Sequence, residues 1–118
     1  MPFDFEKLDV YKRAVQFIEK IYQATEKFPS YELYGLTAQL RRAAVSIATN
    51  IAEGSGRYHK RDHQQFLRMA RSSCYECVPL LEIARNLAHM DIETHAGLYK
   101  DCNDLAMMLN RFIDALRK

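Results

Sequence analysis

The chain has 118 residues, of which 48% are hydrophobic and 27% are charged, a composition typical of one globular domain and not of a disordered chain. Its net charge is only +2, but residues 41–71 contain seven Lys and Arg against two acidic residues. Four Gly and three Pro are too few for the turns of a many-stranded sandwich or barrel, so we expect a single all-α domain over residues 1–118.

The first helix is predicted over residues 8–27. Apolar side chains there recur at helical spacing and occupy an arc of about 160°, while charged side chains fill the other side. Pro29 ends the helix, because the residue before a proline is pushed out of the α conformation. The apolar arc is wider than one bundle core needs. Tyr11, Val15 and Tyr22 lie at its edge, and we expect them to contact a neighbouring subunit.

The second helix is predicted from Thr37, a suitable N-cap, to about Glu53, with Gly54 as the left-handed residue that ends it. Its core-facing residues are Leu36, Leu40, Ala43, Ala44, Ile47 and Ile51. A second apolar strip on another side of the helix consists of Ala38, Val45, Ala48 and Ala52. Helices with two apolar sides are usually buried on both, and small side chains let another helix approach closely. We therefore expect the second strip to lie in a subunit interface.

The third and fourth helices are predicted over residues 60–88 and 92–117. Pro79 lies inside the third helix and removes one backbone hydrogen bond, so we expect a kink near residues 75–79. The apolar face of the third helix is predicted to contain Phe66, Met69, Ala70, Ser73, Cys77, Leu80, Leu81, Ala84 and Leu87. Four long helices with short connections predict an antiparallel up-down-up-down four-helix bundle.

Polar side chains on the second helix recur every three or four residues, which places them on one continuous stripe. The stripe consists of Gln39, Arg42, Ser46, Asn50, Glu53 and Arg57. If the second and third helices form a hairpin centred near residue 59, Arg42 faces Glu76. The same register places Glu53 near Gln65 and Arg68. We interpret the stripe as a structural network of ion pairs and amides that fixes the helix register. The alternatives are a ligand or catalytic site and a network between subunits.

Basic residues gather where the second and third helices meet. Arg57, Lys60 and Arg61 lie near the start of the third helix, and Arg68 follows about two turns later. Together with backbone N–H groups, these cations would suit an anion such as a nucleic-acid phosphate. The alternative is an ordinary solvated loop. The Gly-Ser-Gly sequence at residues 54–56 follows no strand and lacks the Lys-Ser/Thr of a phosphate-binding loop, so nucleotide binding is not predicted.

Other chemical motifs favour structural roles. Cys74 and Cys77 have the spacing of a redox or zinc pair, but they lie in a helix without a second pair, so we interpret them as core thiols. His59 and His63 have no obvious further ligand beside them. None of the glutamates has the His three residues later that a di-iron bundle needs. We predict no metal, no cofactor and no enzymatic activity.

The cellular location is predicted from the cysteines and from the hydropathy. Three cysteines, an odd number, favour reduced thiols in the cytoplasm over a disulfide framework. The N-terminal sequence has no apolar stretch typical of a secretory signal. No apolar run approaches the roughly 18 residues that a membrane helix needs. We therefore expect a cytoplasmic protein without a membrane partner.

Residues 5–14, 28–57 and 66–76 resemble the family of four-helix-bundle proteins that are encoded in intervening sequences of bacterial large-subunit ribosomal RNA genes. The positions that match the family pattern are Gln39, Arg42, Ser46, Asn50, Glu53, Gly54, Arg57, Ala70, Arg71, Ser73 and Glu76. We therefore include Arg71 and Glu76 in the predicted polar network. The resemblance implies a homo-oligomeric ring, a pentamer in comparable members, and no established biochemical activity. A related branch comprises accessory proteins of diversity-generating retroelements, which bind nucleic acid through a basic ring surface.

Two functions follow from these observations. The first is a non-enzymatic bundle that self-associates and serves as a binding or scaffold module. The alternative is a nucleic-acid-binding accessory protein that uses the basic region between Arg41 and Arg71. An enzyme with Arg42 and Glu53 in a pocket is the least favoured hypothesis.

Overall fold

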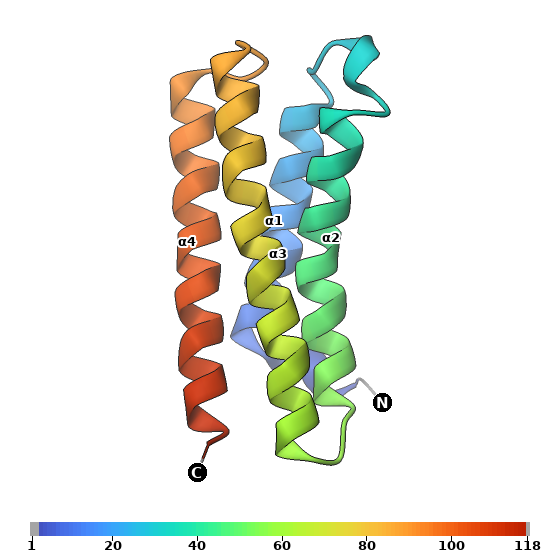
Figure 1. Cartoon of the computed structure of the whole chain (residues 1–118), viewed down its shortest axis with the longest axis vertical. Coiled ribbons are helices and arrows are strands. Elements are labelled where there is room, and N and C mark those ends of the chain that lie inside the picture. Colours follow the sequence, from blue (N-terminus) through green and yellow to red (C-terminus); the bar gives the residue numbers. More distant parts are fainter. Residues whose placement is uncertain (1–2, 118) are drawn as a thin grey trace.

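The computed structural model describes residues 3–117. It contains four long helices: α1 (Asp9–Thr25), α2 (Leu36–Ser55), α3 (Lys60–Asn86) and α4 (Ile92–Ala115). Two short 3-10 helices, η1 (Asp4–Lys7) and η2 (Ser30–Glu32), precede α1 and α2. The long helices lie side by side and alternate in direction along a molecule about 45 Å long (Figure 1). The described chain is therefore the predicted all-α four-helix bundle.

The core is formed by one apolar stripe from each long helix. Its largest fully buried side chains are Phe17, Ile21, Leu40, Ile47, Ile51, Leu67, Leu81, Leu105 and Leu109, together with three cysteines. The predicted face of α3 is partly wrong, because Met69 and Leu87 are 44% and 55% exposed. Leu67 and Cys74, on the other edge of the stripe, are buried instead. Apolar residues extend around α3 beyond the core, and periodicity alone does not tell which edge faces the neighbouring helices.

The third helix is continuous through Pro79, which is exposed on its surface. It ends at Asn86, two residues before the predicted end. An exposed proline still removes one backbone hydrogen bond, but here the helix continues for seven more residues.

The start of α2 differs from the prediction. Gly35 is the N-cap, and Thr37 is buried inside the first turn, so the predicted Thr37 cap is wrong. The Leu36 backbone N–H instead donates to Glu32 Oε1 at 3.2 Å. Glu32 Oε2 lies 3.0 Å from His89 Nε2, in the connection between α3 and α4. These two contacts, the Leu36 bond above all, lower the pKa of Glu32 and join two loops at one end of the bundle.

Gly54 does not end α2, because the helix continues through Ser55. Among the described glycines none has a positive φ. A Cβ atom placed on Gly54 would lie 2.7 Å from Phe66 Cβ and 3.3 Å from the His63 carbonyl oxygen. The glycine is therefore needed for the close approach of α2 to α3, and the predicted left-handed cap at this position is wrong.

A left-handed residue does occur where α3 ends, at Ala88 with φ 62°. The His89 N–H donates to the Ala84 carbonyl at 2.8 Å, and the Ala88 N–H donates to the Arg85 carbonyl at 2.9 Å. This bond pattern is the Schellman motif, whose left-handed position is usually glycine.

The substitution Ala88→Gly is expected to stabilise the bundle. The left-handed conformation costs an L-residue about 1–2 kcal/mol, which glycine avoids. Glycine also makes the unfolded chain more flexible, and this offsets part of the gain in stability. We expect the free energy of unfolding to rise by about 0.5–1 kcal/mol in urea titrations. The matched control is Ala96→Gly on the exposed side of α4, which should lower it by about 1 kcal/mol. If both variants lost the same free energy of unfolding, the left-handed conformation at Ala88 would not be strained.

Candidate functional site

Ser46 is the centre of the polar contacts between α2 and α3. Its hydroxyl accepts hydrogen bonds from Ser73 Oγ at 2.9 Å and from Asn50 Nδ2 at 3.0 Å. Asn50 Nδ2 also donates to the Ser46 carbonyl at 2.8 Å. One turn away, Arg42 Nη2 lies 2.7 Å from Glu76 Oε2, the pairing expected from the hairpin register. The stripe therefore bonds α2 to α3 at two neighbouring levels.

Glu53 takes a different partner from the expected one. Arg57 Nη2, in the turn just after α2, lies 3.3 Å from Glu53 Oε2. The Arg57 guanidinium also stacks over the Phe66 ring, with its carbon 4.6 Å from the ring centre. Gln65, which the hairpin register places near Glu53, is exposed on α3, and Arg68 is half-buried on the same helix. Because Glu53 and Arg57 are four residues apart in the chain, their ion pair does not fix the position of α2 relative to α3.

Two further members of the predicted network lie outside the contacts around Ser46. Gln39 is exposed at the N-terminal end of the stripe. Arg71 Nη1 donates to Asn110 Oδ1 at 2.7 Å, which joins α3 to α4 instead of α2. The sequence analysis missed Asn110, although an amide directly after the core residue Leu109 was a usable signal.

The expected energy of the Arg42–Glu76 pair follows from its exposure. The two side chains are 64% and 41% exposed, and water screens such pairs. We expect Arg42→Ala to lower the free energy of unfolding by only about 0.2–1 kcal/mol in urea titrations. A double-mutant cycle with Glu76→Ala isolates the pair energy. A coupling above about 2 kcal/mol would contradict a solvent-exposed pair.

The turn between α2 and α3 places three predicted anion contacts close together. Arg57, Lys60 and Arg61 are all exposed there, and Tyr58 between them is 95% exposed. The His59 ring lies against the Tyr58 ring with centres 4.9 Å apart and planes at 82°. The turn therefore exposes cationic and aromatic side chains together at one end of the bundle.

The two histidines four residues apart do not form one site. The His63 ring packs edge-on against Phe112, 5.1 Å away, whereas His59 contacts Tyr58. The His63 Nε2 atom is buried without a hydrogen-bond partner in the described part of the chain, and this burial lowers the pKa of His63. Within residues 3–117, no group of three or more His, Cys, Asp or Glu is placed to hold a metal ion.

The three cysteines are buried free thiols on α3 and α4. Cys102 Sγ donates to the Cys74 carbonyl at 3.1 Å, a contact across the helix seam that the sequence analysis did not anticipate. Contact with Cys102 and burial raise the pKa of the Cys74 and Cys77 thiols, which keeps both protonated at neutral pH. Cys74 and Cys77 therefore fill the core as neutral thiols.

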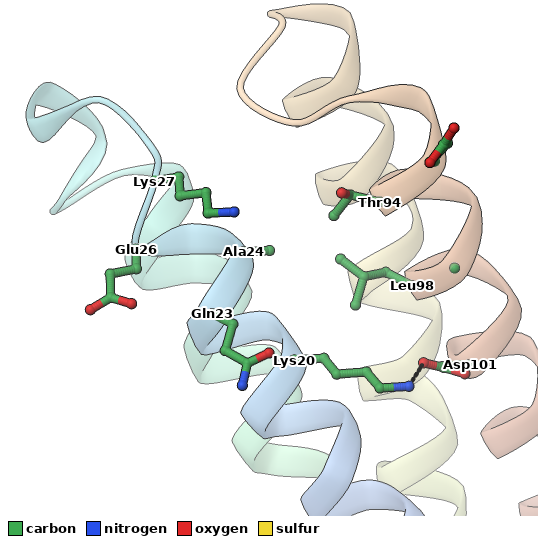
Figure 2. Close-up of a pocket in the computed structure, with 10 residues that line it drawn as sticks. Lys20, Gln23, Ala24, Glu26, Lys27, Thr94, Leu98 and Asp101 are labelled. Atoms are coloured by element: carbon green, nitrogen blue, oxygen red, sulfur yellow. Dashed lines mark hydrogen bonds and ion pairs between the residues drawn. The ribbon is translucent and has the colours of Figure 1, made fainter.

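A groove of about 560 Å³ separates the upper halves of α1 and α4 (Figure 2). Lys20 Nζ reaches across it to Asp101 Oδ2 at 2.8 Å, and Lys27 and Thr94 face one another further along. The lining combines two lysines with three carboxylates. Charges of both signs are nearly balanced in this groove, which favours neither an anion nor a cation as its ligand.

These features describe a helical bundle with a bonded α2–α3 seam and a basic turn. The profile of the 23S rRNA-intervening sequence protein family matches residues 6–111, and the chain belongs to this family, as the resemblance predicted. It is also similar to a solved protein of unknown function from the S23 ribosomal protein family of Bacteroides thetaiotaomicron. The TM-score is 0.79 at 20% identity, over 88% of this chain and 97% of that one, which shows a shared fold. No curated protein matches the chain.

None of the described helices is long and apolar enough to cross a lipid bilayer.

Proposed function

We propose that this protein is a non-enzymatic bundle that self-associates and serves as a binding or scaffold module. The observation that supports it is an apolar surface along the outside of α1 and α2. This α1–α2 apolar strip consists of Tyr11, Val15 and Tyr22 on α1 with Ala38, Val45 and Ala52 on α2. Tyr22 and Ala38 are exposed, and the other four side chains are half-buried.

Helix geometry explains why the strip is continuous. Ala38, Val45 and Ala52 are seven residues apart, so they lie along one side of α2. Arg41, beside Ala38, holds its guanidinium carbon 4.4 Å from the centre of the Tyr22 ring, which connects this side of α2 to α1. Apolar side chains gathered on one outer face of a bundle favour a partner that covers them.

The predicted strip needs one correction. Ala48 is 6% exposed and belongs to the core of the bundle, so it is not available to another subunit. It lies seven residues after Arg41, on the side of α2 that faces α1. Its small side chain therefore permits close packing of these two helices within one chain.

A ring is the form of assembly that we propose. Contacts between two different surfaces of identical chains produce a closed ring when the rotation between neighbours closes. The number of five subunits follows from the family resemblance alone. A reducing compartment, the cytoplasm, is supported by the three buried free thiols.

The variant Val45→Arg tests this proposal. Arginine at this half-buried position would place a charge in the middle of the interface while leaving the bundle core intact. We expect light scattering to show a monomer for Val45→Arg at concentrations where the parent protein is an oligomer. The matched control is Gln16→Arg, on an exposed position of α1 outside the strip, which should assemble like the parent. An unchanged oligomer of Val45→Arg would exclude the α1–α2 apolar strip as the interface.

The second candidate function is nucleic-acid binding through the basic region between Arg41 and Arg71. The exposed Arg57, Lys60 and Arg61 at the α2–α3 turn favour it. A retardation assay tests it, because phosphate contacts release counterions and make the affinity fall steeply with salt. Absence of any retarded species at low salt would exclude this function.

A further inference from the structure

The α2–α3 turn exposes an aromatic ring among basic side chains. Tyr58 is 95% exposed, although a phenol ring of this size is normally at least partly covered by its own chain. The residues around it, 57–61, carry three cations and no acidic side chain. An aromatic ring between cations is the arrangement that holds a stacked base beside its phosphates.

The basic side chains between Arg41 and Arg71 differ in the contacts that they make. Arg42 is paired with Glu76, and Arg71 donates to Asn110, so both of these arginines are engaged in joining helices. At the turn, Arg61 is exposed. Arg57 lies over the Phe66 ring and 3.3 Å from Glu53 Oε2, and its side chain is 45% exposed. Three cationic side chains, those of Arg57, Lys60 and Arg61, are therefore exposed within three residues of Tyr58.

The Tyr58 ring has an aromatic neighbour in the next residue. The His59 ring lies nearly perpendicular to it, with ring centres 4.9 Å apart and planes at 82°. At 95% exposure, Tyr58 leaves its ring open for a base to stack on.

We infer that the α2–α3 turn is a contact site for single-stranded nucleic acid, with a base stacked on Tyr58 and phosphates bound by Arg57, Lys60 and Arg61. This inference rests on the second candidate function and specifies the element and the strand state that it recognises. Unpaired bases are required, because the faces of the bases in a duplex are already covered by their neighbours.

Fluorescence anisotropy with a labelled oligothymidylate of about twenty nucleotides, and with a duplex of the same length, tests the inference. We expect the single strand to bind more tightly, and log K to fall with log salt with a slope of about −2 for three phosphate contacts. Arg61→Ala should reduce that slope by about 0.7. Tyr58→Ala should weaken binding about fivefold to 150-fold, the equivalent of one stacked base. Tyr58→Phe retains the ring and should bind within about twofold of the parent.

The matched control is Tyr34→Ala, which removes a similarly exposed tyrosine (92%) from the other end of α2 and should leave binding unchanged. Both tyrosines are on the surface, so thermal melts should show folded proteins. Equal affinity for the duplex, or parent-like binding by Tyr58→Ala, would overturn the inference while nucleic-acid binding by another surface stands. A parent protein that binds neither probe at low salt would overturn both.

Discussion

Gly54→Ala is expected to destabilise the bundle, although alanine is the better helix former. The new methyl group would lie 2.7 Å from Phe66 Cβ and 3.1 Å from His63 Cδ2. Phe66 Cβ is fixed to the backbone of α3 and cannot rotate away, so the two helices must separate. Overpacking of this kind costs about 1–3 kcal/mol, which exceeds the gain of at most about 1 kcal/mol in helix propensity. We expect a lower denaturation midpoint in urea.

The control for this prediction is Gly97→Ala on α4. A Cβ atom at Gly97 would meet nothing within 4 Å, so only the helix propensity changes. The free energy of unfolding should rise by about 0.5–1 kcal/mol. If both glycine variants were stabilised, α2 and α3 would not be packed as closely as the structure has them.

Ala48→Arg is expected to have the larger effect of two arginine substitutions on α2. Ala48 is 6% exposed in the core, so an arginine there would bury a charge without a partner and overfill the space between α1 and α2. Such a charge costs about 3–5 kcal/mol, a large share of the stability of a domain of this size. Circular dichroism should show a largely unfolded or strongly destabilised protein.

Val45→Arg is the comparison, three residues earlier and on the outer side of the same helix. Its monomer should remain folded and lose no more than about 1 kcal/mol. A folded, stable Ala48→Arg protein would contradict the position of α1 against α2. An unfolded Val45→Arg protein would instead mean that the bundle depends on its assembly.

The fold was predictable because helix periodicity is a local property. The spacing of apolar residues in α1 and α2 places the core stripe without knowledge of the neighbouring helices. The pairing of Arg42 with Glu76 followed from the antiparallel hairpin, since a two-helix register is fixed by its turn.

The remaining features depend on distances between segments, which a single sequence does not contain. The role of Gly54 arises from the approach of Phe66 on another helix. The α2 cap comes from Glu32, which also contacts His89 more than fifty residues away. One edge of the α3 core face was misplaced because apolar residues extend on both sides of it. For the basic turn, the sequence supplied the cations, and the structure added the exposure of Tyr58.

The mass of the parent protein in solution tests self-association most directly. Sedimentation equilibrium over a range of concentrations gives this mass without assumptions about shape. We predict a species of two or more 13.8 kDa chains, and of five such chains if the ring follows the family resemblance. A mass of 13.8 kDa that persists at the highest concentrations would show a monomer with an uncovered α1–α2 apolar strip, and would contradict the proposed function.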